Sequence, residues 1–73
     1  MKLKNLRQKR HELGLSQTAL GERLYVHQQQ ISAIERGQNV RRTTAHRLAD
    51  ALGCDVAELL DPEIAQTLKA LKR

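Results

Sequence analysis

The sequence predicts an all-α fold, a compact bundle of about five or six short helices. Apolar residues recur at intervals of three and four in several segments, which is the spacing of one face of a helix. Tyr25 is the single aromatic residue, whereas sheets favour aromatic and β-branched side chains. The 73 residues suffice for one domain with a small core.

The first helix is expected over residues 2–13. Its inward face runs through Leu3, Leu6 and Leu13, and Arg10 falls on the same face. A guanidinium among leucines cannot lose its charge and needs a carboxylate partner. The spacing therefore predicts a buried ion pair that involves Arg10.

Two short helices joined by a tight turn are expected next. Ser16 is a suitable N-cap for a helix over residues 17–24, and a second helix follows over residues 28–36. Gly21 lies inside the first of them, where glycine costs about 1 kcal/mol relative to alanine. A close approach by the backbone of another helix would explain it.

The helix over residues 28–36 has two different faces. Ile31 and Ile34 mark the inward face, and Glu35 at its edge is the predicted partner of Arg10. The opposite face lacks the lysine and glutamate of an ordinary solvated surface; it consists of Gln28, Gln29, Ser32, Ala33 and Arg36. Amides, a hydroxyl and a methyl group are what base edges in a DNA major groove can bind.

Three further helices complete the predicted bundle. One begins at Thr43 or Thr44, a short one follows the capping-box pattern from Asp55 to Glu58, and the last starts at Asp61-Pro62. The apolar residues of the last two either pack on the domain's own core or form a dimer interface. These residues are Val56, Leu59, Leu60, Ile64, Leu68 and Leu71.

The chain is basic, with 13 Lys plus Arg against 8 Asp plus Glu and a net charge of +5. In so small a domain this excess favours a polyanionic partner, nucleic acid before a membrane. An ordinary soluble basic protein would have the same balance. Arg41 and Arg42 follow the helix over residues 28–36, where they either bind phosphate groups or are simply solvated.

Other functional classes find no support in the sequence. No segment approaches the roughly 20 apolar residues of a membrane span, and no signal core follows the first lysines, so we expect a cytoplasmic protein without membrane contact. The single cysteine, Cys54, permits no internal disulfide or zinc motif. The histidines lie in separate elements, so no metal or other cofactor is expected, and no catalytic constellation indicates an enzyme.

The order of these motifs resembles the phage-repressor and Cro-like (Xre) helix-turn-helix family. The residues that carry the resemblance are Leu13-Gly14-Leu15-Ser16-Gln17, Leu20, Leu24, Val26, Ile31, Ile34-Glu35-Arg36-Gly37, Leu48-Ala49-Asp50-Ala51-Leu52-Gly53 and Glu58-Leu59-Leu60. The resemblance implies a lambda-repressor-like fold, in which residues 17–24 cross the DNA backbone and residues 28–36 enter the major groove. It divides the chain into a helix-turn-helix domain, 1–61, and a C-terminal helix, 62–73, that packs or dimerises.

The resemblance also assigns roles to individual residues. It implies an ion pair between Arg10 and Glu35, as the helical spacing does. The chain departs from the family at three places. The family usually has glycine in place of Tyr25, a serine, threonine or aspartate cap in place of His27, and a Pro-Ser pair in place of Val40-Arg41. The implied base contacts are Gln28, Gln29, Ser32 and Ala33, and the implied backbone contacts are Gln17, Arg36, Arg41 and Arg42.

The sequence thus predicts a sequence-specific regulator that binds double-stranded DNA. We expect a repressor that occupies a near-palindromic operator as a homodimer, of bacterial, phage or plasmid origin. The alternative is an antitoxin-type protein, which neutralises a partner toxin and regulates its own promoter. A helical scaffold without DNA binding is a third possibility.

Overall fold

Six α-helices joined by short connections make up the described part of the chain. The computed structural model describes residues 1–71, except for the side chains of residues 64, 65, 68 and 69. No strand occurs within that range, so the all-helical prediction is confirmed. The helices are α1 (Leu6–Glu12), α2 (Gln17–Leu24), α3 (Gln28–Glu35), α4 (Arg42–Leu52), α5 (Val56–Leu60) and α6 (Pro62–Leu71).

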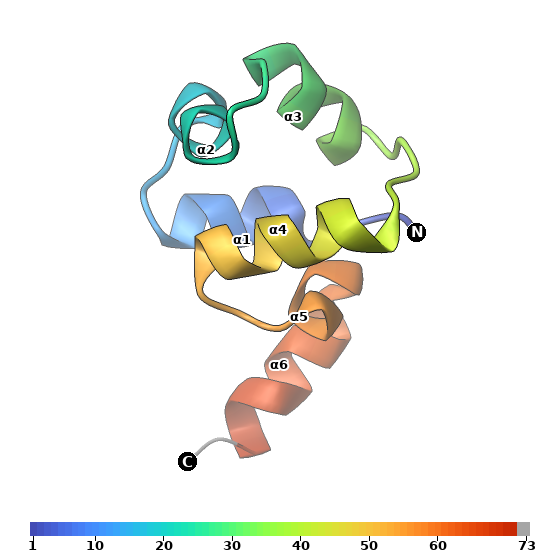
Figure 1. Cartoon of the computed structure of the whole chain (residues 1–73). Helices are drawn as coiled ribbons and strands as arrows, with labels where there is room; N and C mark the ends of the chain where they lie inside the picture. Colours follow the sequence, from blue (N-terminus) through green and yellow to red (C-terminus); the bar gives the residue numbers. More distant parts are fainter. Residues whose placement is uncertain (72–73) are drawn as a thin grey trace.

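The helices lie in three levels (Figure 1). At one end are α2 and α3, which pack against each other, and α1 and α4 lie at the level beneath them. Below these, α5 contacts both α1 and α4, and α6 extends from α5 away from the rest of the bundle. The outer side of α3 therefore lies at the opposite end of the molecule from α6.

The hydrophobic core lies where the first five helices meet. Every side chain of α6 that the structure describes is exposed, so the described part of this helix adds nothing to that core. The division between residues 1–61 and 62–73 stays a prediction. The core side chains are Leu3, Leu6, Leu20, Leu24, Ile31, Ile34, Ala45, Leu48, Ala49, Leu52 and Leu59.

The predicted first helix was wrong at its start and in one inward residue. It begins at Leu6 instead of residue 2, because the Asn5 backbone nitrogen donates to the Leu59 carbonyl oxygen at 2.9 Å and draws this segment onto α5. Leu13 is 48% exposed and does not face the core. The chain turns directly after it, and Leu15 packs against the core instead.

Side-chain caps fix several helix ends as predicted. The Ser16 hydroxyl accepts a hydrogen bond from the Ala19 backbone nitrogen at 2.9 Å, and Asp55 and Glu58 form the capping box of α5. Such a cap typically contributes about 1 kcal/mol. The start of α4 differs from the prediction. The helix begins at Arg42 instead of at Thr43 or Thr44, and no side chain caps it.

Two arginines join the C-terminal ends of α2 and α4. Arg47 donates to the Leu24 carbonyl oxygen at 2.6 Å, and Arg23 donates to the Ala51 carbonyl oxygen at 3.1 Å. Carbonyl groups in the last turn of a helix lack partners within that helix, and a cation there also suits the helix dipole. The partly buried Arg47 bond helps to hold α2 in position on α4, whereas the Arg23 bond is exposed to solvent.

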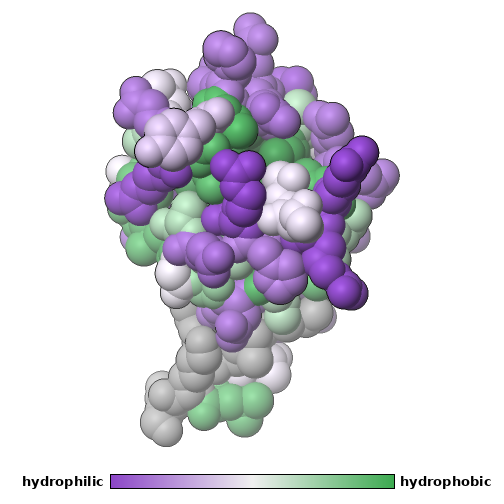
Figure 2. Space-filling view, viewed as in Figure 1, coloured by the Kyte–Doolittle hydropathy of each residue, from purple (hydrophilic) through white to green (hydrophobic). Residues whose placement is uncertain are grey.

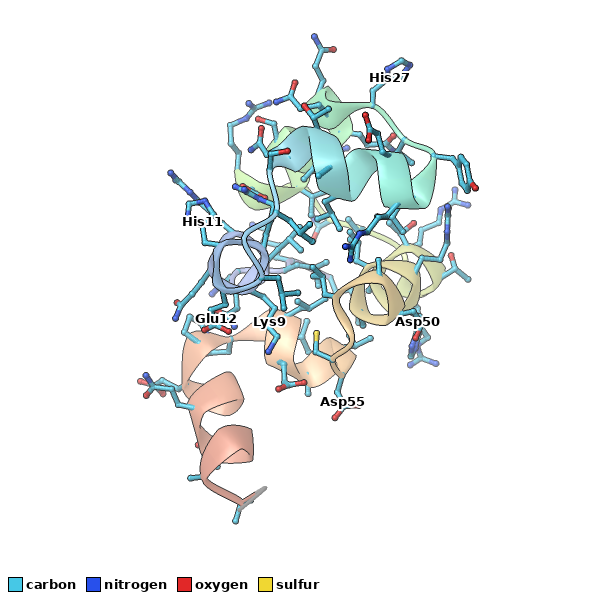
Figure 3. All side chains as sticks on the ribbon, turned by 90° about the vertical axis from the view of Figure 1, so that its left-hand side faces the viewer. Lys9, His11, Glu12, His27, Asp50 and Asp55 are labelled. Atoms are coloured by element: carbon cyan, nitrogen blue, oxygen red, sulfur yellow. The ribbon has the colours of Figure 1, made fainter. Side chains whose placement is uncertain are left out.

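A polar cluster joins α1 to α5 and was not foreseen in the sequence. Glu58 is only 3% exposed, and its carboxylate lies 3.8 Å from the Lys9 ammonium. The Asn5 side-chain amide donates to the Glu58 carbonyl oxygen at 2.7 Å. Lys9 and Glu12 lie on the side of α1 that faces α5 (Figure 3). The cluster fixes the start of α1 relative to α5.

Candidate nucleic-acid interface

Gly21 allows the turn between α2 and α3 to fold tightly against α2. A Cβ atom at Gly21 would lie 2.7 Å from the Val26 carbonyl oxygen and 3.5 Å from the Gln28 backbone nitrogen. The close approach predicted at Gly21 is therefore real, but it comes mainly from this turn instead of from the body of another helix. The turn in this way sets the position at which α3 begins.

Tyr25 adopts the left-handed conformation that the turn requires. Its φ and ψ are 58° and 41°, which costs a non-glycine residue about 1–2 kcal/mol. The side chain is 94% exposed, so packing does not offset this cost. His27 follows as the N-cap of α3, in extended conformation and without a side-chain capping bond. With Tyr25 and His27 in the turn, α2 and α3 both form and pack against each other.

The outer face of α3, defined as Gln28, Gln29, Ser32, Ala33 and Arg36, is turned away from the core. Gln28, Gln29 and Arg36 are exposed and the other two residues are half-buried, while Ile31 and Ile34 on the opposite side are 0% and 4% exposed. Arg36 donates to the Ser32 hydroxyl oxygen at 2.8 Å. Gln30 lies off this face and lines a shallow apolar depression between α3 and α4.

Arg10 and Glu35 form an ion pair at the junction of α1 and α3. Arg10 Nε donates to Glu35 Oε2 at 2.7 Å, and Nη2 donates to Oε1 at 3.1 Å. A third bond joins Arg10 Nη1 to the Leu15 carbonyl oxygen at 2.8 Å. The two side chains are only 8% and 5% exposed. Each charge is therefore stabilised mainly by its partner and only slightly by hydration.

The pair keeps Glu35 ionised. Burial alone would raise the pKa of this carboxyl, but the hydrogen bonds from Arg10 and Gln17 and the charges of Arg10 and Arg7 outweigh burial and lower it. The hydrogen bond to Glu35 likewise raises the pKa of the Arg10 guanidinium, against the opposing effect of burial. Both groups are therefore charged at neutral pH.

A chain of amides connects this ion pair to the outer face of α3. Gln17, the first residue of α2, donates through Nε2 to Glu35 Oε1 at 3.1 Å. Gln28, the first residue of α3, donates through its own Nε2 to Gln17 Oε1. A glutamine amide has two N–H donors and one carbonyl acceptor. Gln28 therefore retains one N–H and its carbonyl oxygen for another molecule.

Exposed arginines flank the outer face of α3 at its C-terminal end. Arg41 and Arg42 lie where the loop from α3 enters α4, and Arg36 is the last residue before that loop. Among the described residues none of the three pairs with a carboxylate. Strongly hydrophilic side chains follow the edge of the molecule at which this loop lies (Figure 2).

The described residues offer no group of His, Cys, Asp or Glu side chains suited to hold a metal ion. His11 and His27 lie on different elements and point into solvent at separate places (Figure 3). Among residues 1–71, none of the helices has the length and hydrophobicity of a membrane span.

Comparison with known families agrees with this geometry. The model of the helix-turn-helix family HTH_3 matches residues 3–59. The chain belongs to the Xre/Cro-like helix-turn-helix family. It is therefore a DNA-binding transcriptional regulator. In helix-turn-helix proteins generally, the second helix of the motif is the one that enters the major groove. No curated protein matches the chain.

The residues predicted for a dimer interface differ in how far they are buried. Leu59 is fully buried in the domain's own core, so its side chain is not accessible to a second subunit in this arrangement. Val56 and Leu60 pack partly against the core, and Leu71 on α6 is 75% exposed. The side chains of Ile64 and Leu68 lie outside the described residues.

Proposed function

We propose that this helix-turn-helix protein is a sequence-specific repressor that binds a near-palindromic operator as a homodimer. The observation that carries the proposal is the outer face of α3, on which two exposed glutamine amides begin the helix and one of them is oriented by Gln17. Bound there, the protein would block other proteins from the same DNA.

The free groups of Gln28 match adenine. With one N–H bonded to Gln17, the remaining N–H can donate to adenine N7 and the carbonyl oxygen can accept from adenine N6. Gln29 is also exposed and offers the same donor and acceptor. Each such bidentate contact discriminates by about 1–3 kcal/mol. Ser32 and Ala33 add a hydroxyl and a methyl group, the latter suited to a thymine methyl.

Four polar residues would fix the register of α3 on the duplex without reading sequence. Gln17 begins α2, whose N-terminal end faces the same side as the start of α3, because the two glutamines are hydrogen-bonded. The arginines at the other end of α3 would bind phosphate groups of the same backbone. The proposed backbone contacts are Gln17, Arg36, Arg41 and Arg42.

Dimerisation would supply the contacts that one domain of this size lacks. A single small module buries about 600–1,000 Å² on DNA, which gives modest specificity. We assign the interface to α5 and α6, because α6 extends away from the bundle with Leu71 exposed. Two α3 helices would then lie about 34 Å apart, one turn of the DNA.

Selection of binding sites from random DNA tests the reading role of α3. Gln28→Ala and Gln29→Ala should each relax the preference at one or two operator positions by about 1–3 kcal/mol. Gln30→Ala is the matched control, because Gln30 lies off the outer face, and its selected sites should equal those of the wild type. If both alanine variants select the wild-type sites unchanged, α3 does not read bases through these amides.

Deletion of residues 62–73 tests the interface. Sedimentation should show a dimer for the full chain and a monomer for the shortened one, whose core is complete without the described side chains of α6. A dimer that survives the deletion would place the interface elsewhere. Recovery of the full chain in equimolar complex with a second protein would instead favour the antitoxin alternative.

A further inference from the structure

We propose that Lys2 and Lys4 bind the DNA phosphate backbone beside the loop between α3 and α4. The inference rests on the proposed DNA binding by α3 and adds to it a segment that precedes the helices of the helix-turn-helix motif. Neither the spacing of the motif nor the charge balance singles out these two lysines. Their role follows from where the fold places them.

Backbone hydrogen bonds hold the first residues against this loop. The Val40 nitrogen donates to the Met1 carbonyl oxygen at 2.8 Å, and the Met1 nitrogen donates to the Val40 carbonyl oxygen at 2.9 Å. Val40 directly precedes Arg41, one of the proposed phosphate contacts. In Figure 1 the start of the chain accordingly lies next to the loop that leads into α4.

Burial of Leu3 turns both lysines outward. Leu3 is 1% exposed and belongs to the core, whereas its neighbours Lys2 and Lys4 are exposed. Together with Arg36 and Gly37, the lysines line an open hollow of about 330 Å³ between the first residues and the C-terminal end of α3. A buried leucine thus anchors the segment while two cations face the same hollow as Arg36.

The charges at this hollow suit phosphate groups. Glu35 is the one carboxylate among its lining residues, and Arg10 and Gln17 already occupy its oxygens. Neither lysine forms an ion pair within the described part of the chain. Lys2, Lys4 and Arg36 line one hollow, and Arg41 follows Val40, the residue to which Met1 bonds; the four residues make a basic edge. A polyanion that runs past the end of α3 would neutralise this edge, and DNA backbone is such a polyanion.

The salt dependence of DNA binding tests this assignment. The double variant Lys2→Ala/Lys4→Ala should lower the slope of log K against log salt by about 1.8, because each lost phosphate contact removes about 0.9. When the salt concentration rises from about 50 to 200 mM, the affinity of the wild type should then fall by a factor about 12 times larger than that of the variant. The probe is a mixed-sequence duplex of about 20 base pairs, long enough for two half-sites.

Arg23→Ala is the matched control. It removes one positive charge from an exposed side chain that is held against Ala51, at the C-terminal ends of α2 and α4. Its slope should equal that of the wild type, and circular dichroism of every variant should show a folded protein. A flatter slope for the lysine variant alone supports the proposal.

Two results would overturn the assignment. If the wild type binds and the lysine variant keeps the full slope, these lysines do not contact phosphate. If Arg23→Ala flattens the slope as much per charge, the effect is one of net charge and the proposed contact is absent. A wild type that binds neither this duplex nor any selected site would refute the DNA-binding proposal itself, and the lysine assignment with it.

Discussion

Replacing Glu35 by glutamine should lower the free energy of unfolding by about 3–5 kcal/mol. The substitution keeps the shape of the side chain but removes the negative charge opposite Arg10, whose side chain is only 8% exposed. The guanidinium cannot lose its proton at accessible pH. It would remain charged, poorly hydrated and bonded to a neutral amide in place of a carboxylate.

This loss is large for a chain of 73 residues. Domains are typically stable by about 0.05–0.15 kcal/mol per residue, which gives about 4–11 kcal/mol here. Removing 3–5 kcal/mol would lower the melting temperature by at least about 12 °C, since 1 kcal/mol corresponds to about 4–8 °C in a domain of this size. Even the smaller value is therefore measurable.

Urea denaturation followed by far-UV circular dichroism measures the effect, because the chain has no tryptophan to serve as a fluorescent probe. The double variant Arg10→Met/Glu35→Leu removes both charges and should be within about 1–2 kcal/mol of the wild type. Together with the single variants Arg10→Met and Glu35→Leu it gives the coupling energy of the pair. The reasoning fails if Glu35→Gln costs less than about 1 kcal/mol, or if the double variant is as unstable as the single ones.

Three further changes test the turn and the ion pair. Gly21→Ala should destabilise the fold by about 1–3 kcal/mol in the same urea assay, since its Cβ would meet the Val26 carbonyl oxygen at 2.7 Å; an unchanged midpoint would show that the turn adjusts freely. Tyr25→Gly should be neutral or stabilise by up to about 1 kcal/mol, because glycine tolerates φ 58° and the exposed ring loses no packing; a clear loss of stability would mean that the tyrosine ring has a packing role. Because the pKa of Glu35 is lowered by folding, the stability it contributes is present above about pH 4.5 and falls as pH drops below that value toward the folded-state pKa. Urea midpoints measured across that range should fall more steeply for the wild type than for Glu35→Gln, and parallel curves would contradict the linkage.

Local patterns were enough to predict most of the fold. The bounds of α2 follow from Ser16, whose side chain caps the helix as expected, and from the turn after Leu24. The ion pair between Arg10 and Glu35 was expected because helical spacing puts each residue on an inward face and a buried charge needs its opposite. Both inferences use rules that depend on residues a few positions apart, namely helix capping and helical spacing, and these can be applied to the sequence alone.

The errors arose where a distant partner decides the conformation. The spacing of Leu3, Leu6 and Leu13 fits one long helix, yet Asn5 bonds to α5, which lies more than fifty residues later in the chain, and the helix starts after it. The spacing of apolar residues does not predict a hydrogen bond between residues so far apart in the chain. The hydrogen bond between Gln17 and Gln28 and the pairing of Met1 with Val40 are equally non-local. For this reason the basic edge beside α3 was not foreseen.

The buried ion pair gives the fold more than stability. A well-packed apolar pair can often replace buried charges without loss of stability, so stability alone does not explain why Arg10 and Glu35 are charged. Glu35 Oε1, however, also accepts from Gln17, and Gln17 in turn accepts from Gln28 on the outer face of α3. An apolar residue at position 35 would preserve the core but leave Gln17 without its acceptor. The same carboxylate thus joins α1 to α3 and helps to orient the amide that we propose reads the DNA.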